Sequence, residues 1–441
     1  MSEKKEITNK KFVLYCVISV VCVLIVAVIV CISFGLSRRR DKSADTTTTI
    51  PQITEEESEL VDEDDGTEKE ISPDSLGYVV LDTIKKVTAY KDGIVALTNT
   101  GTVYLSSSED TTTNKFNYSN PVMLVDNDEV FVFDKNGTDF HLENSEKTIC
   151  TNEDFKDVIK YGIQAADYRD DVFAIATKSN PNNSYFVVFT KSGDVKAHGY
   201  LEKEYITDIK LTQDGKGVVI AAIGSDNAEI YTYYKAIKFD YDDFEYTANF
   251  SNEAPVYLYA KSSERIITVT NSFFRIMTYT RSEDENNTVD VILDFGSNTL
   301  LAVLADNNSA YITIALAAYG SSDYISLYFY GTDGTLYSVV ELNEAYKSID
   351  ASDKYVTVDY GNTVEVYSRE GEKCGSIRLN TAQTLSTSNS TNVFVLADNY
   401  FYELKAKGKY KFAENSSDNN QNYETQVFTI PVTEEDSTLE K

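Results

Sequence analysis

The stretch Leu300–Leu342 decides the fold class, because four short strand-like runs follow one another in it. It reads LLAVLADNNS (300–309), AYITIALAAYG (310–320), YISLYFYGTDG (324–334) and LYSVVEL (336–342). The runs are rich in Val, Ile, Leu, Tyr and Phe, and Gly, Asn, Asp and Ser stand between them. Such runs, bounded by turn residues, predict β-strands joined by hairpins. The second run is apolar almost throughout, which is typical of a strand that is buried on both faces.

This four-strand unit recurs along most of the chain. Eight copies begin near residues 84, 121, 157, 205, 255, 298, 346 and 384, so the spacing averages about 43 residues. That period is typical of the four-stranded blades of a β-propeller. The eighth copy lacks its fourth strand, and the run GYVVLD at 77–82 can supply it from the other end of the domain, which closes the ring without an exposed sheet edge. We predict an all-β, eight-bladed β-propeller; seven blades and a β-sandwich array are the alternatives.

Composition divides the rest of the chain. A short N-terminal tail (1–11) precedes FVLYCVISVVCVLIVAVIVCISFGL at residues 12–36, which has no charged residue. As a helix it would extend about 37 Å, enough for the ~30 Å hydrocarbon core of a membrane. We predict a single-pass transmembrane α-helix at 12–36, retained as a signal-anchor, and a disordered acidic, Thr-rich linker at 37–75. The propeller then occupies 76–411, and a disordered acidic tail occupies 412–441, where VFTIPV (427–432) can pair as a strand or bind a partner.

The orientation of the anchor does not follow from its flanks. Four basic residues stand on each side of residues 12–36, so the positive-inside rule does not decide. The acidic domain and its stalk-like linker favour a propeller outside the cell membrane. A cytoplasmic propeller that serves an internal complex is the alternative.

Charge and rare residues exclude several functions. The chain has 70 Asp and Glu against 40 Lys and Arg, a formal net charge of −30, which argues against a nucleic-acid partner. It has two His, five Cys and no Trp. This argues against a zinc enzyme and against a His-activated nucleophile. We therefore predict no catalytic residue, no cofactor and no metal site.

The remaining chemistry-bearing residues have ordinary explanations. We expect His141 and His198 to be solvated in the outer parts of different blades, and Cys150 and Cys374 to be separate thiols on the outermost strands of the second and seventh copies. Glycosylation triplets at Asn136 and Asn249 follow from an Asn- and Thr-rich composition. Three carboxylate clusters are expected in polar loops: Asp167, Asp170 and Asp171; Asp240, Asp242, Asp243 and Glu245; and Glu283, Asp284 and Glu285.

Two loops are better candidates for binding. The segments SNPNNS (179–184) and GSDN (224–227) fall between second and third strands, where loops help to form one face of a propeller. Asn, Asp and Tyr side chains on such a face suit hydrogen bonds and stacking to sugars or peptides. Ordinary turn chemistry explains the same residues.

The anchor, the acidic linker and the degenerate blades with Gly-containing hairpins resemble an uncharacterised family of bacterial single-pass membrane-anchored β-propeller proteins. Their architecture is similar to that of quinoprotein-like and WD40-like repeats. The resemblance implies a propeller on a membrane stalk. It does not imply quinone chemistry, because the docking tryptophans are absent.

We expect a membrane-anchored binding or scaffold module at the cell surface whose propeller face docks a protein or a cell-envelope polymer. The ligand itself is not identified by the sequence, and an enzyme is the less favoured interpretation. The alternative function is a cell-envelope carbohydrate-active enzyme, a lyase or hydrolase that uses carboxylates in the propeller channel. Carboxylates that converge within about 5–10 Å would favour the enzyme.

Overall fold

A computed structural model describes residues 77–79, 83–106, 111–156, 159, 161–180, 183–226, 229–240, 246–279, 287–305, 310–321, 324–342, 344–352, 354–378, 384–397, 400–407, 411–413 and 426–428. The chain divides into two units, Met1–Thr67 and Glu68–Lys441, and every described residue belongs to the second. The predicted transmembrane helix (12–36) and the predicted linker (37–75) lie outside the described residues. Within the described ranges, no helix has the length and apolar character needed to cross a membrane.

The second unit is built from eight antiparallel sheets, one for each predicted blade. Blade 1 comprises β2 (Ile84–Tyr90), β3 (Gly93–Thr98), β4 (Gly101–Ser106) and β5 (Thr112–Lys115), and blade 2 comprises β6 (Pro121–Asp126), β7 (Glu129–Asp134), β8 (Phe140–Glu143) and β9 (Thr148–Thr151). Blade 3 comprises β10 (Ile163–Arg169), β11 (Val172–Asn180), β12 (Asn183–Thr190) and β13 (Val195–Glu202), and blade 4 comprises β14 (Glu204–Leu211), β15 (Gly217–Asp226), β16 (Glu229–Lys238) and β17 (Tyr246–Ser251). Blade 5 comprises β18 (Pro255–Ser262), β19 (Arg265–Thr270), β20 (Phe273–Thr278) and β21 (Thr288–Asp294). Blade 6 comprises β22 (Thr299–Leu304), β23 (Tyr311–Ala317), β24 (Ile325–Gly331) and β25 (Leu336–Leu342). Blade 7 comprises β26 (Ser348–Ala351), β27 (Tyr355–Asp359), β28 (Thr363–Ser368) and β29 (Lys373–Arg378).

Blade 8 combines strands from both ends of the domain. Its order is β30 (Thr384–Ser388), β31 (Asn392–Ala397), β32 (Tyr400–Lys407) and then β1 (Gly77–Val79), which pairs antiparallel with β32. The predicted eight-bladed ring and its closure by the N-terminal strand are therefore confirmed. β34 (Gln426–Phe428), from the predicted tail, pairs in parallel with β1, and β33 (Lys411–Ala413) pairs with β32.

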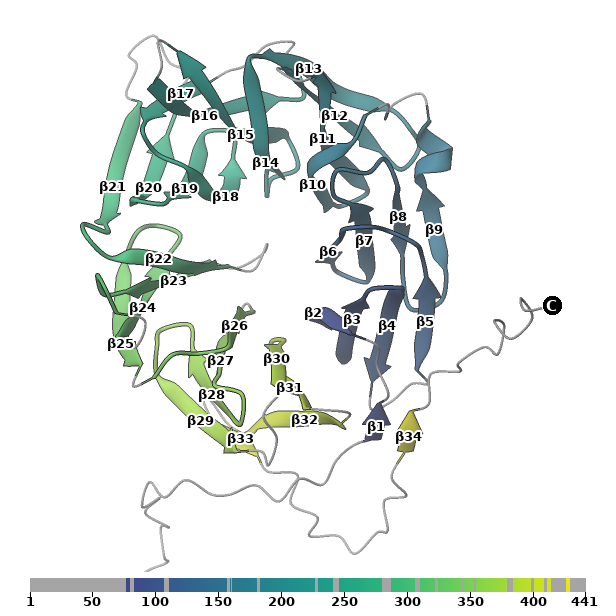
Figure 1. Cartoon of the computed structure of the whole chain (residues 1–441), viewed down its shortest axis with the longest axis vertical. Coiled ribbons are helices and arrows are strands. Elements are labelled where there is room, and N and C mark those ends of the chain that lie inside the picture. The colour runs from purple at the N-terminus through teal and green to yellow at the C-terminus, as the bar shows by residue number, and fades with distance from the viewer. Residues whose placement is uncertain are drawn as a thin grey trace, which may run out of the picture. The chain divides into compact units, whose positions relative to one another are not determined.

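The first strand of each blade lies toward the middle of the ring, and the later strands lie progressively outward (Figure 1). The second strands are buried, as their apolar composition predicts; every residue of β3 and of β27 is buried. Neighbouring blades pack face to face through these strands. The cluster between blades 2 and 3, for example, contains Phe131 from β7 and Phe173 and Phe189 from β11 and β12.

The start of the third blade differs from the prediction. The sequence placed it near residue 157, whereas β10 begins at Ile163. The connection before it contains a short 3-10 helix, η1 (Asn152–Phe155). Phe155 and Ile159 from this connection are buried in the core between blades 2 and 3. Their apolar character therefore serves packing of the connection and not a strand.

Candidate functional site

One end of the sheets carries two sets of connections. Because the strands within each blade are antiparallel, the links between second and third strands emerge at the same end as the links between successive blades. We call this end the upper face. It includes the described residues of the two segments that the sequence singled out, namely 179–180, 183–184 and 224–226, whereas residues 181, 182 and 227 lie outside the described residues. It also exposes Tyr319 and Tyr324, which lie in the link between β23 and β24.

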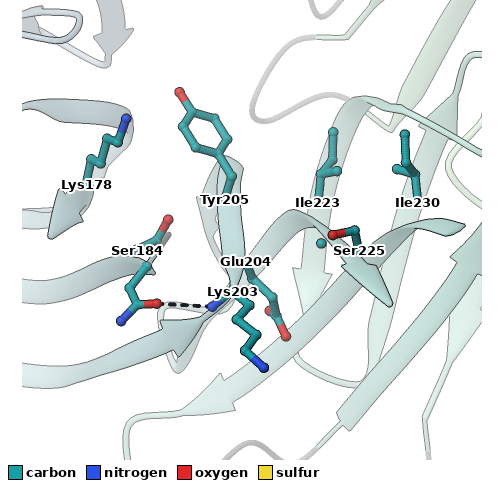
Figure 2. Close-up of a pocket in the computed structure, with 10 residues that line it drawn as sticks. Lys178, Ser184, Lys203, Glu204, Tyr205, Ile223, Ser225 and Ile230 are labelled. Carbon is teal, nitrogen blue, oxygen red and sulfur yellow. Dashed lines mark hydrogen bonds between the residues drawn. The ribbon is translucent and has the colours of Figure 1, made fainter. Parts of the chain in front are cut away.

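A groove of about 460 Å³ opens on the upper face between blades 3 and 4. Figure 2 shows the ring of Tyr205 between Lys178 on blade 3 and Ile223 and Ile230 on blade 4. The volume lies within the range of small-molecule sites. The residues that line the groove are Lys178, Asn183, Ser184, Lys203, Glu204, Tyr205, Ile223, Gly224, Ser225 and Ile230. The fold thus brings described residues of both candidate loop segments to one groove.

A single residue connects the two blades at this groove. β13 ends at Glu202 and β14 begins at Glu204, so that Lys203 alone joins them. Lys203 has a φ of 60°, and its backbone N–H donates to the side-chain oxygen of Asn183 at 3.2 Å (Figure 2). Successive side chains of a strand point to opposite sides. Tyr205 accordingly points away from Glu204 in Figure 2.

The carboxylate of Glu204 is only partly satisfied. Its Oε1 accepts a hydrogen bond from the Lys235 ammonium at 2.8 Å. Its Oε2 is buried and has no hydrogen-bond partner within the described part of the chain. A buried acceptor without a donor costs about 1–3 kcal/mol.

Gly224 lets the neighbouring side chains approach closely at the groove. A Cβ atom at this position would lie 2.9 Å from the Tyr233 ring and 3.3 Å from Cγ of Glu204. The first distance is shorter than real Cβ contacts allow. A larger residue would therefore displace the Tyr233 ring or Glu204.

Lys178 and Lys203 are the unpaired charges of the groove. Both side chains are exposed, and no described carboxylate lies within 4.0 Å of either ammonium group. The Tyr205 side chain is 45% exposed and points away from that of Lys203 (Figure 2), and the Ile230 side chain is 54% exposed. The groove therefore presents positive charge next to an aromatic ring and an aliphatic wall, in a chain whose net charge is −30.

The inner strands of blades 3 and 4 carry a second charged cluster. The Lys210 ammonium on β14 lies 3.6 Å from Oδ1 of Asp167 on β10 and 3.9 Å from Oδ1 of Asp208. Burial raises the pKa of Asp208. Burial alone would lower the pKa of Lys210, but Asp208 and Asp167 raise it overall. Asp167 was expected in a polar loop and is instead almost fully buried on a strand.

This cluster brings two carboxylates to one lysine, but it does not have the chemistry of a catalytic acid–base pair. Lys210 lies against both carboxylates, and Asp167 also accepts the backbone N–H of Leu211 at 2.9 Å. We interpret it as an ion-pair link between two blades.

His141 also differs from its prediction. It was expected to be solvated, but it is buried on β8, because that strand lies inside the junction between blades 1 and 2. Its Nε2 lies 3.0 Å from Oε2 of the fully buried Glu143, and its Nδ1 lies 2.7 Å from the Tyr118 hydroxyl. His198 is exposed on β13, as expected.

The cysteines behave as two separate thiols, as predicted. Cys150 lies on β9 of blade 2 and Cys374 on β29 of blade 7, and both are free. Burial raises the pKa of each thiol to about 11. Neither thiol is therefore activated as a nucleophile at neutral pH.

The other acidic candidates do not form a site within the described ranges. Asp170 and Asp171 form the turn between β10 and β11, with φ of 46° and 67°. Asp240 ends a described segment, and Asp242, Asp243, Glu245, Glu283, Asp284 and Glu285 lie outside the described residues. Asn136 lies in the turn after β7, and Asn249 lies on β17. Among the described residues, no group of three His, Cys, Asp or Glu side chains is arranged to hold a metal ion.

The family is established by the sequence over the whole propeller. Residues 77–406 match the family model described as a family of unknown function, DUF5711. The chain belongs to the DUF5711 family. No curated protein matches the sequence significantly.

Solved structures show that this DUF5711 propeller has a WD40-like fold. The C-terminal WD40 domain of Sif2 superimposes with a TM-score of 0.53 at 11% identity, covering 78% of this chain and 100% of that domain. Apo AztD from Citrobacter koseri gives a TM-score of 0.47 at 9% identity over 75% of this chain and 92% of its own. Hsv2 from Kluyveromyces lactis gives 0.44 at 10% identity over 67% and 97%. At these identities the likeness concerns the fold alone.

Sequence reasoning found the two loops of the groove but missed Lys178, Lys203 and Tyr205. Lys178 precedes one loop on β11, Lys203 is the link between the two blades, and Tyr205 is the second residue of β14. A lysine and a tyrosine in strand-like runs carry no sequence signal of their own. Only the packing of blade 4 against blade 3 shows that they share a groove.

Proposed function

We propose that this DUF5711 protein is a membrane-anchored binding module whose upper face docks a component of the cell envelope. The observation that carries the proposal is the groove between blades 3 and 4. Its lining includes two lysines without a carboxylate partner among the described residues, an exposed tyrosine and an exposed isoleucine. A WD40-like propeller is a rigid scaffold for such a site, and function in these folds belongs to the site and its loops.

The proposed anchor is the apolar segment at residues 12–36, which lies outside the described residues. Basic residues flank it on both sides, and the acidic linker that follows would hold the propeller away from the membrane. The proposal places the propeller on the extracellular side. It is supported by the strongly acidic composition of the chain, which suits neither nucleic acid nor an anionic inner leaflet.

Protease accessibility tests the topology. Intact cells are treated with protease, and the released fragments are identified by mass spectrometry. We expect a stable soluble fragment that contains the strands from β2 to β32, because the linker is cleavable and the sheets are not. Protection of the propeller until the membrane is lysed would place it inside and refute the proposed location.

Co-sedimentation tests the binding function itself. The full-length chain in detergent is mixed with isolated cell envelopes of the organism that produces it, and the pellet is compared with that of a quadruple variant, Lys178→Gln, Lys203→Gln, Tyr205→Ala and Ile230→Ala. We expect the unaltered chain to sediment and the variant to remain soluble. Equal sedimentation of both would show that the groove is not the docking site.

A further inference from the structure

We propose that β21 of blade 5 accepts an extended segment of a partner protein as an additional strand, and that apolar residues alternate with Lys or Arg in this segment. The strand lies apart from the groove between blades 3 and 4, so the inference does not depend on the proposed function. It follows from three properties of β21: its open backbone edge, its exposed side chains and the sign of its charge.

β21 is an outermost strand with an open backbone edge. The strand order in blade 5 is β18-β19-β20-β21, so β21 pairs with β20 alone among the described strands. Figure 1 shows it at the outer end of the blade. Its pairing with β20 is regular from Thr288 to Val291 and shifts at Ile292. A bulge of this kind commonly ends regular pairing. We therefore define residues 288–291 as the docking edge.

Both sides of the docking edge are exposed. All four of its residues are exposed, with Val289 at 43% and Val291 at 52%. These two valines lie on one side of the strand, and Thr288 and Asp290 lie on the other, because side chains alternate along a strand. No other outermost strand of blades 1 to 7 has four consecutive exposed residues in the described part of the chain. An added strand would therefore find the edge open over its whole length.

The docking edge lacks the devices that protect other sheet edges of the ring. A lysine on an edge strand opposes pairing with another chain, and so does a very short strand. β5, β13 and β29 carry Lys115, Lys196 and Lys373, respectively. β9 has four residues, and the described exposed side chains of β17 are polar. β21 instead presents two valines and no basic residue, as expected of an edge that a partner covers.

β25 of blade 6 is the strand most similar to β21. It also lacks a basic residue, and it exposes three apolar side chains. However, its exposed residues alternate with less exposed ones beyond the first two positions. Its carboxylate, Glu341, accepts from the Ser326 hydroxyl at 2.9 and 3.0 Å. Asp290 has no such partner in the described part of the chain. β21 is therefore the better candidate.

The charge of the docking edge selects a basic partner. β20 and β21 together carry two carboxylates, Asp290 and Asp294, and one cation, Arg275. Arg275 is buried and paired with Glu253 at 2.5 Å. Directly opposite strand residues of opposite charge contribute about 0.2–1 kcal/mol, and like charges are unfavourable. A Lys or Arg opposite Asp290 also places its two neighbours on the side of the valines, where apolar side chains fit. The partner segment therefore alternates apolar and basic residues.

A second copy of the chain is the alternative occupant. Edge strands of two copies can pair about a two-fold axis. However, each copy carries a net charge of −30, and two such charges repel one another. β21 itself has no basic residue that could stand opposite Asp290. A partner rich in Lys or Arg is attracted by the same charges, so we assign the edge to a different protein.

Fluorescence anisotropy tests the proposal with the full-length chain in a non-ionic detergent. The probe is a labelled nine-residue peptide in which valine alternates with lysine. One control peptide alternates valine with glutamate, and the other has the composition of the probe with its valines and lysines in separate blocks. We expect the probe to bind saturably and each control to bind at least about tenfold more weakly. Glutamate repels Asp290, and the block peptide cannot present its valines on one side and its lysines on the other.

Variants and hydrogen exchange assign the binding to the docking edge. Val291→Lys and Asp290→Lys are each expected to weaken binding of the probe about tenfold or more, because each places a cation on the edge. Both side chains are exposed, so the Tm should stay within about 2 °C of the unaltered chain. Glu202→Lys is the matched control, since it makes the same charge change at an exposed position of β13, the outermost strand of blade 3. The bound probe should slow amide exchange in residues 288–291 and leave β13 unchanged.

Three results would overturn the proposal. The first is equal affinity for the probe and either control peptide. The second is slowed exchange on another strand with none in residues 288–291. The third is a dimer of the unaltered chain in sedimentation velocity that Val291→Lys dissociates, because the occupant would then be a second copy. None of these results bears on the co-sedimentation experiment, because no residue of the docking edge lines the groove between blades 3 and 4.

Discussion

Removing the carboxylate of Glu143 should loosen the junction between blades 1 and 2. This side chain is fully buried on β8. Its Oε1 accepts hydrogen bonds from the hydroxyls of Thr102 and Tyr104 on β4, the latter at 2.9 Å, and its Oε2 lies 3.0 Å from Nε2 of His141. A carboxylate can only accept, so Nε2 of His141 carries a proton. One side chain thus links two blades through three donors.

The expected loss follows from those contacts. Glu143→Ala leaves three buried donors without an acceptor, and each unsatisfied buried donor costs about 1–3 kcal/mol, so we expect a total loss of about 3–5 kcal/mol. At roughly 2 °C per kcal/mol for a domain of this size, the Tm should fall by about 6–10 °C. Glu143→Gln keeps one acceptor oxygen and should cost about 1–2 kcal/mol. Glu146→Ala is the control, because Glu146 is exposed in the turn after the same strand.

Differential scanning calorimetry and hydrogen exchange measure this effect. We expect faster amide exchange in β4 and β8 of the Glu143→Ala chain and unchanged exchange in blades 5 and 6. A double-mutant cycle of Glu143→Gln with Tyr104→Phe should show a coupling of about 1 kcal/mol, since the two side chains share a hydrogen bond. A Tm within 1–2 °C of the unaltered chain for Glu143→Ala, or exchange accelerated evenly around the ring, would refute this account of the junction.

Three further predictions concern acid stability, thiol reactivity and ring closure. Burial alone would raise the pKa of Glu365, but Lys373 at 2.6 Å and the hydroxyls of Tyr367 and Tyr360 lower it overall. The ionised Glu365 carboxylate therefore stabilises the folded chain above about pH 4.3, its pKa in the unfolded chain, and this stabilisation is lost as the pH falls through its pKa in the folded chain. The difference in Tm between the unaltered chain and Glu365→Gln should accordingly shrink between pH 6 and pH 3. Cys150 and Cys374 have thiol pKa values of about 11, so iodoacetamide should alkylate them slowly at pH 7.5, and the rate should rise about tenfold for each unit of pH. Peptide mass spectrometry measures this rate. Labelling at pH 7.5 as fast as that of a small thiol would contradict the prediction. Deleting Gly77–Val79 removes the outer partner of β32 and should cause concentration-dependent association by light scattering, whereas deleting residues 56–58 of the linker should not.

Much of the fold could be predicted because its signals are local. The alternation of apolar and polar residues along a strand records which side is buried, and Gly-containing turns mark the hairpins. Repetition of the four-strand unit then predicts the number of blades, and a missing strand at one end with a spare strand at the other predicts the closure through β1. The wrong start predicted for the third blade also comes from a local signal. Phe155 and Ile159 are apolar and buried like residues of a strand, but they lie in the connection before β10.

The candidate site depended on contacts that no local pattern records. His141 was expected to be solvated in the outer part of its blade. It is buried instead, where it meets Glu143 of its own strand and the hydroxyl of Tyr118, which lies 23 residues earlier in the sequence. Lys203 and Tyr205 read as part of a strand, and only the position of blade 4 beside blade 3 places them opposite Lys178.

The sequence by itself determined an all-β chain of eight four-stranded repeats, because strand and turn preferences act over a few residues and the repeats preserve them. Only the tertiary structure decided which side chains meet between blades: the buried Glu143 junction, the Lys210 ion pairs and the groove of Lys178, Lys203 and Tyr205. These contacts depend on how neighbouring blades pack in the ring. The twist and stagger of two neighbouring sheets determine which of their side chains meet, and both are properties of the assembled ring that no single repeat contains.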